Sequence, residues 1–256
     1  MVTEHATLET SDDAVLGGRL RLRQPLRGHR VGHDAILLAA ATAAKAGDCA
    51  FDLGAGVGAA GLALASRVEG LSVTLADIDP ALCALAADNA RRNALDGRVR
   101  ALALDVTEPA AFAAHGVAAG RADCVLMNPP FNDATRQNVS PDARRRLAHA
   151  AAPDTLPQWL AAAAWLLRPG GVLTLIWRAD GLAALLAALG ASFGGIAVLP
   201  VYPRSDASAI RVLVRASKGG SAPLALRPGL VLNDERGQPT AAAEAVLRGG
   251  STLSFY

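Results

Sequence analysis

From residue 47 onward, short apolar runs alternate with longer segments that have the composition and spacing of helices. This alternation is typical of a parallel sheet with helices on both faces. The expected strands are residues 49–53, 71–76, 99–104, 123–127, 172–177, 196–200 and 209–214, and the expected helices are 59–67, 80–93, 107–115, 155–167 and 181–189. We therefore predict an α/β fold built on a single doubly wound, mostly parallel, seven-stranded sheet of the Rossmann-like kind.

The length of 256 residues allows one α/β domain with a full-sized core. We expect an N-terminal extension with an Arg-rich hairpin and a helix over residues 1–46, the α/β domain over 47–216, and a C-terminal segment packed on the same domain over 217–256. Hydrophobic residues make up 52% of the chain but aromatic residues only 4%, so small aliphatic side chains must build most of the core.

The chain carries no sign of a membrane span or of an exported protein. No stretch approaches the about 20 strongly apolar residues that a membrane-spanning helix needs. The first residues also lack the basic and then apolar order of a secretory signal. Cys49, Cys83 and Cys124 show no metal-binding spacing and indicate buried free thiols. We therefore expect a cytoplasmic protein that binds neither membrane nor metal.

A glycine-rich motif at residues 52–58 directly follows an expected strand and opens a helix. Gly54, Gly56 and Gly58 let the backbone turn tightly and approach a ligand, and free N–H groups at the helix start face the same cleft. A second glycine spacing, at residues 56–61, also fits the dinucleotide-binding fingerprint. Asp52 favours a ligand with a cationic amino group, such as S-adenosylmethionine, because a carboxylate there would face a pyrophosphate unfavourably.

Carboxylates end two further expected strands. Asp77 follows the apolar run 73–76, at the end of a strand where ligands of open α/β sheets bind, and it can accept both hydrogens of a ribose diol. Asp79 directly precedes Pro80 and is expected to cap the next helix. Asp105 could accept a hydrogen bond from an adenine amine, and a helix cap is its alternative role.

Asn128, Pro129, Pro130 and Phe131 directly follow the apolar run 124–127. The Asn128 side-chain oxygen and the Pro129 carbonyl can each accept one N–H of a planar amine, and the prolines stiffen the backbone. Phe131 offers a flat surface for stacking, a contact worth about 1–3 kcal/mol with a nucleobase. Positioning of the amine would supply much of the catalysis without a strong general base. The alternative is a strand terminator with no ligand.

The net charge of +2 does not by itself indicate a nucleic-acid-binding protein. Arg19, Arg21 and Arg23 alternate with leucines, which on a strand would place all three guanidinium groups on one face. A second group, which includes Arg144 and Arg145, lies in a polar stretch at residues 132–151. Both groups are candidate contacts for RNA phosphates, and solvated surfaces without a partner are the competing interpretation.

The order and spacing of these motifs resemble those of class I S-adenosylmethionine-dependent methyltransferases that modify exocyclic or amide nitrogens. The resemblance covers residues 47–135, and it rests on the glycine-rich motif, Asp77, Asp105 and the Asn-Pro-Pro-Phe tetrapeptide. Residues 16–39 resemble the lead-in of the small-domain group, and are most similar to that of bacterial valine-tRNA adenine-N6 methyltransferases. The resemblance implies S-adenosyl-L-methionine as cofactor, adenine-N6 of a tRNA near the anticodon as acceptor, and Asp34 as a further cofactor contact.

Other functions stay open. Methylation of guanine-N2 in ribosomal RNA needs the same amine geometry, and the Asn-Pro-Pro-Phe variant also occurs in such enzymes. Methylation of glutamine-N5 in a protein would normally have Tyr at the position of Phe131 in the resembling family. A nicotinamide-dependent oxidoreductase is supported only by the glycine spacing at residues 56–61, with no identifiable hydride-transfer residue. A module that binds the cofactor without turnover is the last alternative.

Overall fold

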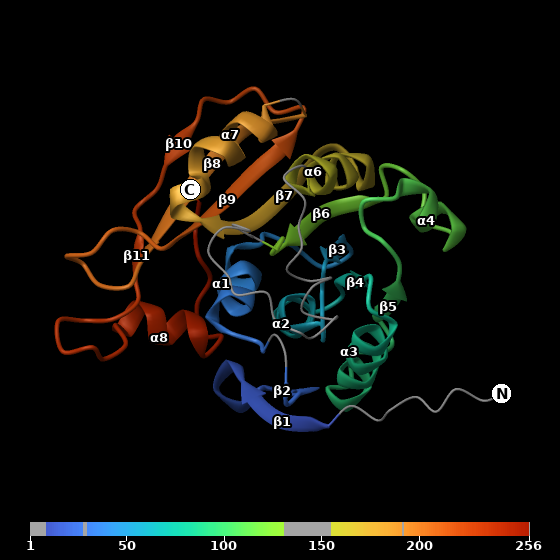
Figure 1. The fold of residues 1–256 in the computed structure, drawn as a ribbon, viewed down its shortest axis with the longest axis horizontal. Coiled ribbons are helices and arrows are strands. Elements are labelled where there is room, and N and C mark those ends of the chain that lie inside the picture. Colours follow the sequence, from blue (N-terminus) through green and yellow to red (C-terminus); the bar gives the residue numbers. More distant parts are fainter. Residues whose placement is uncertain (1–8, 28–29, 131–154, 191, 256) are drawn as a thin grey trace.

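A mostly parallel sheet runs through the centre of the fold (Figure 1). The computed structural model describes residues 9–27, 30–130, 155–190 and 192–255. The strands of this sheet are β3 (Cys49–Leu53), β4 (Ser72–Asp77), β5 (Val99–Ala103), β6 (Ala122–Met127), β7 (Leu167–Arg178), β8 (Phe193–Tyr202), β9 (Arg211–Lys218), β10 (Ala225–Leu226) and β11 (Leu230–Val231). They lie in the order β10-β8-β9-β7-β6-β3-β4-β5, and β11 also pairs with β8.

The strand directions agree with the predicted α/β fold. β3 to β7 are parallel to one another, and β9 runs antiparallel to both β7 and β8. The mostly parallel sheet is therefore confirmed. The predicted number of strands needs one correction, because the described residues alone form nine strands of this sheet and not seven. The two additional strands, β10 and β11, are short and pair in parallel with β8.

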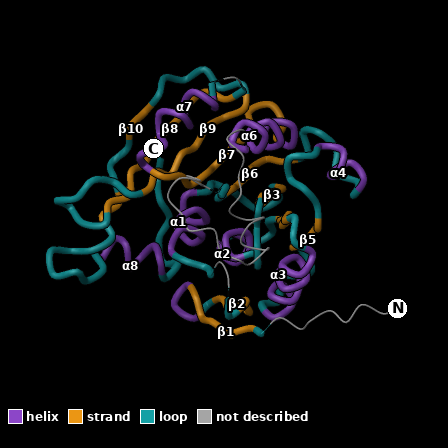
Figure 2. Tube along the Cα trace, in the orientation of Figure 1, coloured by secondary structure: helices purple, strands orange, loops and turns teal. Residues whose placement is uncertain are grey.

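Helices cover both faces of the sheet (Figure 2). They are α1 (His33–Ala41), α2 (Ala59–Arg67), α3 (Pro80–Arg92), α4 (Pro109–Ala114), α6 (Thr155–Leu166), α7 (Leu182–Leu189) and α8 (Ala241–Leu247). Buried side chains form two clusters, one including α1, α2, α3 and α8 and the other including α4, α6 and α7. The sheet therefore separates two hydrophobic cores.

Strand β6 shows how the sequence builds both cores at once. Successive side chains of a strand point to opposite faces. Cys124 and Leu126 accordingly belong to the core beneath α1 and α2, while Val125 and Met127 belong to the core beneath α6. All four side chains are at most 2% exposed. An apolar run without polar interruptions is what a strand covered on both faces requires.

An N-terminal hairpin packs outside the main sheet. Its strands β1 (Thr10–Val15) and β2 (Leu20–Pro25) are antiparallel and form a separate two-stranded sheet. Leu20 and Leu22 are fully buried in the core shared with α1, α2 and α3. Arg21, between these leucines, and Arg23, directly after them, are exposed, as the predicted alternation requires.

The C-terminal segment is built into the same fold. Strands β10 and β11 extend the sheet beside β8, and α8 packs against α1. Beyond α8, the Leu253 N–H donates to Ala40 O at 3.0 Å, and Phe255 is buried. The Arg215 guanidinium lies 5.1 Å from the centre of the Phe255 ring.

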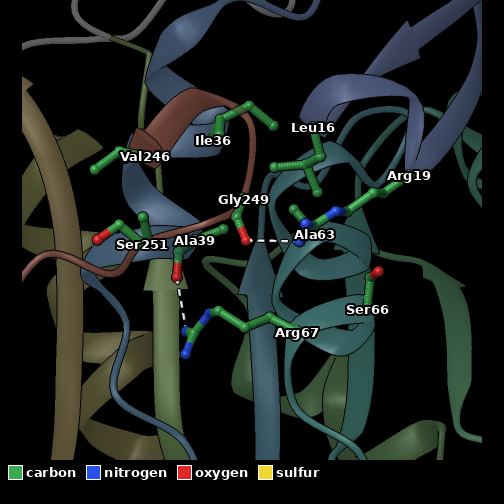
Figure 3. Close-up of a pocket in the computed structure, with 11 residues that line it drawn as sticks. Leu16, Arg19, Ile36, Ala39, Ala63, Ser66, Arg67, Val246, Gly249 and Ser251 are labelled. Carbon is green, nitrogen blue, oxygen red and sulfur yellow. Dashed lines mark hydrogen bonds between the residues drawn. The ribbon is translucent and has the colours of Figure 1, made fainter. Parts of the chain in front are cut away.

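A small cavity of about 70 Å³ lies between the N-terminal hairpin, α1, α2 and the C-terminal segment (Figure 3). Arg67, in the last turn of α2, donates to Ala39 O at 3.0 Å and to Thr42 O at 2.6 Å. Arg19 donates to Gly249 O at 2.9 Å. Both guanidinium groups therefore tie neighbouring segments together. Because the glycine-rich motif precedes the first residue of α2, this cavity lies at the other end of that helix.

In the described part of the chain, no helix combines the length and the apolar character that crossing a membrane requires.

Candidate active site

The candidate residues gather along one edge of the sheet. Gly54 follows β3, Asp77 ends β4, Asp105 lies two residues after β5, and Asn128 follows β6. These strands are adjacent in the order β6-β3-β4-β5. Leu53 is in register with both Met127 and Ala76, so the four strand ends lie side by side. With about 4.8 Å between strands, the row spans roughly 15 Å. This edge is the usual ligand site of an open α/β sheet.

The glycine-rich loop is held in its conformation by β4. The N–H groups of Gly54 and Ala55 donate to Ala76 O at 2.8 and 3.0 Å, and the N–H of Gly56 donates to Asp77 Oδ2 at 2.8 Å. Gly54, Gly56 and Gly58 have φ values of 68°, 56° and 88°, which favour glycine. The expected tight turn is therefore present.

The space around these glycines differs. A Cβ at Gly54 would lie 2.4 Å from Cη2 of Trp159 in α6, so the Trp159 ring packs directly on this backbone. A Cβ at Gly58 would lie 2.8 Å from the Leu75 side chain. A Cβ at Gly56 would meet no described atom within 4 Å. Gly56 is therefore the position at which the loop backbone is open to a ligand. The sequence alone did not indicate that Trp159 lies against this loop.

Asp52 lies beneath the loop and is only 2% exposed. Its Oδ2 accepts a hydrogen bond from the Gly61 N–H at 2.8 Å. Burial raises the pKa of Asp52 to about 7, the Gly61 N–H opposes this rise, and the nearby Asp77 carboxylate adds to it. Asp52 therefore changes from its neutral to its ionised form near neutral pH. A cationic group at the loop would favour its ionised form.

Asp77 is half-buried and is oriented by the backbone. Its Oδ2 accepts the Gly56 N–H and its Oδ1 accepts the Asp79 N–H at 2.9 Å. Burial raises the pKa of Asp77, and these two N–H groups lower it. Each carboxylate oxygen can accept more than one hydrogen bond, so both can still receive a diol. Ile78, the next residue, is 50% exposed and presents an apolar surface beside this carboxylate.

Asp79 and Asp105 each accept hydrogen bonds from residues that follow closely in the chain. Asp79 Oδ1 accepts the Ala81 N–H at 2.8 Å, which confirms its predicted role as the cap of α3. Asp105 Oδ1 accepts both the N–H and the hydroxyl of Thr107, at 2.9 and 2.7 Å. Asp105 therefore holds the turn that precedes α4, and it does not cap that helix directly.

Asn128 and the two prolines stand at the end of β6. Asn128 Oδ1 is buried, and no described residue donates a hydrogen bond to it. Pro129 is buried, and Pro130 is half-buried. A buried acceptor without a partner costs about 1–3 kcal/mol. The amide is therefore poised to accept an N–H from a ligand. Phe131, Arg144 and Arg145 lie outside the described residues.

Asp34 reaches the same edge of the sheet from the first turn of α1. Its Oδ2 lies 2.9 Å from Arg211 Nε, and both side chains are 28% exposed. Arg211 begins β9 and is in register with Arg178 at the end of β7. In the strand order, β7 lies between β6 and β9. The ion pair therefore lies two strands away from Asn128 along the sheet. The sequence did not indicate this pair, whose members are 177 residues apart.

The arginines of the hairpin are exposed, as predicted, but they have partners. Arg21 Nε lies 3.5 Å from Asp12, and Arg23 Nη1 lies 3.5 Å from Asp88. Arg19 donates to a backbone carbonyl, as described above. The sequence has no acidic residue between Asp13 and Asp34, but β1 and α3 bring carboxylates to this surface. Its positive charge is therefore partly compensated. Within the described ranges, no three His, Cys, Asp or Glu side chains form a metal-binding group.

Comparison with known proteins adds a family to this geometry. The family model described as methyltransferase small domain matches residues 30–200. A release factor glutamine methyltransferase of Chlorobaculum tepidum is 33% identical over 162 residues, which cover 60% of this chain and 54% of that protein. The enzyme of the same name from Moorella thermoacetica is 37% identical over 130 residues, covering 48% of this chain and 44% of that protein. The chain thus spans about half the length of these curated relatives.

Solved structures are similar over more of the chain. The crystal structure of a predicted O-methyltransferase from Agrobacterium tumefaciens is 30% identical, with a TM-score of 0.73, and the match covers 86% of this chain and 98% of that one. A 16S rRNA N2 G1207 methyltransferase of Thermus thermophilus, in complex with AdoMet and guanosine, is 24% identical with a TM-score of 0.56. That match covers 83% of this chain and 51% of the other, and it indicates a shared fold.

Proposed function

The chain belongs to the methyltransferase small domain family of S-adenosylmethionine-dependent enzymes, and we propose that it methylates the exocyclic amine of a nucleobase in RNA. The observation that carries this proposal is Asn128 Oδ1, a buried acceptor that no described residue satisfies, at the end of the strand beside the glycine-rich loop. An amine with two N–H groups would satisfy this oxygen.

The proposed chemistry depends on orienting the amine. The nitrogen of such a group is a poor nucleophile because its lone pair is delocalised into the ring. Asn128 Oδ1 and Pro129 O would each accept one N–H, so the amine would be held in a single orientation suited to attack. Phe131 would stack on the base. Since the nitrogen becomes more acidic as it is methylated, its proton can pass to water without a strong base. Positioning would supply much of the rate.

The cofactor would occupy the row of strand ends. When bound, S-adenosyl-L-methionine supplies a methyl group activated by a positive sulfonium. Gly56 leaves room for a ligand against the loop, and Asp77 is oriented to receive a ribose diol. Ile78 offers an apolar surface for an adenine ring. Asp52 would respond to the positive charge of the amino acid end. Asp34 and Asp105 stay candidate contacts, and loop residues Gly54 and Gly58 would shape the cradle.

For the acceptor, we propose adenine-N6 of a tRNA near the anticodon. The exposed arginines of the hairpin support an RNA acceptor, although Arg21 and Arg23 would have to exchange a carboxylate for a phosphate. Arg19, Arg144 and Arg145 are further candidate phosphate contacts. Guanine-N2 of ribosomal RNA would use the same amine site.

A protein glutamine side chain is the second candidate acceptor. It is favoured by the curated relatives named release factor glutamine methyltransferase, which are 33% and 37% identical over the matched residues. A glutamine amide also presents two N–H groups to Asn128 and Pro129. The two candidates therefore share the amine site and differ in what surrounds it.

One labelling experiment separates these acceptors. The protein is incubated with methyl-labelled S-adenosylmethionine and, in separate reactions, with total tRNA, ribosomal RNA and a protein extract from cells that lack its gene. The proposal expects label in tRNA, recovered as N6-methyladenosine after digestion. Label recovered as N2-methylguanosine would assign the guanine reaction. Label only in protein, recovered as N5-methylglutamine, would overturn the RNA proposal in favour of the second candidate.

A further inference from the structure

Two asparagines attach the N-terminal hairpin to helix α3. Asn89 Oδ1 accepts the Arg23 N–H at 2.7 Å, and Asn89 Nδ2 donates to Arg23 O at 2.9 Å. One turn later, Asn93 Oδ1 accepts the Arg21 N–H at 2.9 Å, and Asn93 Nδ2 donates to Arg21 O at 2.8 Å. Residues four apart on a helix lie on the same face. The two amides therefore pair with the edge of β2 as a neighbouring strand would.

Asn89 makes one contact that Asn93 does not. Its Nδ2 also donates to Val57 O at 3.0 Å. Val57 belongs to the glycine-rich loop and lies between Gly56 and Gly58, which both have positive φ. Asn89 is fully buried, so water does not compete for these hydrogen bonds. Asn93 Nδ2 donates instead to Asn89 O, within its own helix.

Three groups from β4 and α3 thus hold the glycine-rich loop in place. Ala76 O and Asp77 Oδ2 hold its first half, and Asn89 Nδ2 holds Val57 in its second half. The first two belong to β4, but Asn89 also holds the hairpin. A displacement of β2 would therefore be transmitted through one buried amide to the loop that, under the proposed function, contacts the cofactor.

We propose that Asn89 is a positioning residue that couples the seating of the N-terminal hairpin to the shape of the cofactor loop. This inference rests on the proposed function for the identity of the ligand. Because coupling between two sites is reciprocal, cofactor binding should also stabilise the hairpin. If a ligand that binds the hairpin changes the affinity for the cofactor by some factor, the cofactor changes the affinity for that ligand by the same factor.

Asn89→Ala and Asn93→Ala form a matched pair for the test. Both remove a two-point contact with β2, but only Asn89→Ala releases Val57. Binding of S-adenosylmethionine is measured by titration calorimetry without RNA, on variants whose fold is checked by circular dichroism. We expect at least a tenfold weaker Kd for Asn89→Ala and a change below twofold for Asn93→Ala. Equal effects in the two variants, or none in Asn89→Ala, would overturn the inference.

Hydrogen exchange on the wild-type protein keeps the inference testable if Asn89→Ala fails to fold. Saturation with S-adenosylhomocysteine should slow exchange of the amides of residues 20–24, which lie outside the row of strand ends. Unchanged exchange in these residues would refute the coupling. If the wild-type protein binds neither S-adenosylmethionine nor S-adenosylhomocysteine, the proposed function fails and this inference fails with it. If the wild-type protein binds them but Asn89→Ala and Asn93→Ala have equal affinities, only the coupling is refuted.

Discussion

At the scale of single residues, Asn128 is the group whose environment points most directly to chemistry. Its oxygen is buried without a described partner at the edge of the sheet where ligands bind. Thr174 Oγ1, in the middle of β7, is buried and unpartnered in the same sense. Both residues have a buried oxygen without a described hydrogen-bond partner, but only Asn128 lies at the edge of the sheet where ligands bind. Comparing them separates a role in catalysis from a role in stability.

Asn128→Ala should lower kcat by roughly 10²- to 10³-fold, the range seen when one oriented hydrogen-bonding group of an active site is removed. The affinity for S-adenosylmethionine should stay within about twofold, because the amide is proposed to hold the acceptor amine and not the cofactor. Single-turnover kinetics and calorimetry measure the two quantities. Thr174→Val is the matched control and should leave both unchanged. A parallel loss of cofactor affinity in Asn128→Ala would make this residue structural.

Asp52 gives a prediction about pH. Burial raises its pKa to about 7 in the folded protein, from 3.8 for an ordinary aspartate. The folded state therefore binds this proton more tightly than the unfolded state does. The resulting stability is fully present below pH 3.8 and is lost as the pH rises through about 7. Burial also raises the pKa of Asp77, so a variant is needed to isolate the contribution of Asp52.

Asp52→Asn should abolish this contribution. Between pH 5 and pH 8, the wild-type free energy of unfolding should fall by roughly 3 kcal/mol relative to that of the variant, at 1.36 kcal/mol per pH unit up to the pKa. Urea unfolding at the two pH values measures the difference. Parallel stability curves for the two proteins would show that Asp52 is ionised throughout.

At the scale of elements, the glycine-rich loop separates two uses of glycine. Gly56 needs its positive φ and faces open space, whereas Gly61 lies inside α2. A Cβ at Gly61 would lie 2.3 Å from Leu75 Cδ2 and 3.1 Å from Asp52 Oδ2. The first glycine is thus required by conformation and by a prospective ligand, and the second by packing between helix and sheet.

Alanine at each position should therefore have different effects. Gly56→Ala should cost about 1–2 kcal/mol of stability through backbone strain and should weaken cofactor binding at least tenfold, because the methyl group enters the open space. Gly61→Ala should cost about 1–3 kcal/mol through overpacking. Thermal unfolding and calorimetry at a temperature where both are folded measure these effects. Unimpaired cofactor binding by Gly56→Ala would place the ligand elsewhere.

The elements also show how far local sequence decides the fold. β3 and α2 begin and end at the predicted residues, because the glycine-rich motif marks the boundary between them. The helix predicted at 107–115 begins only at Pro109, since a residue before proline is disfavoured in the helical conformation and Glu108 is extended. The strand predicted at 172–177 extends back to Leu167, where a shift of register accommodates the extra residues beside β6.

Part of the candidate site could likewise be predicted from local sequence, and part of it could not. The carboxylates and Asn128 could be placed together because parallel strands present their ends at one edge. Trp159 on Gly54, Arg211 on Asp34 and Asn89 between hairpin and loop could not be predicted, since each joins segments distant in the chain. No periodicity or local motif records such contacts.

At the scale of the whole molecule, the two terminal segments converge on the face formed by α1, α2 and α3. The hairpin packs on α3 through asparagines, and the C-terminal segment packs on α1 through α8. Leu20, Leu22, Val246 and Phe255 all join one hydrophobic core with α1 and α2. The helix that opens at the glycine-rich loop is therefore supported from both ends of the described chain.

Phe255 tests whether the C-terminal segment contributes to the stability of the whole fold. The side chain is 3% exposed, and the Arg215 guanidinium stacks on its ring. Phe255→Ala should lower the free energy of unfolding by about 3–5 kcal/mol, the range for removal of a buried aromatic side chain. Urea unfolding measures the change, and an unaltered m-value would show that the same surface is exposed on unfolding.

Leu224→Ala, in the same segment but 52% exposed, is the control and should change stability by less than about 0.5 kcal/mol. If Phe255→Ala behaves like this control, the Phe255 side chain adds nothing to the stability of the core.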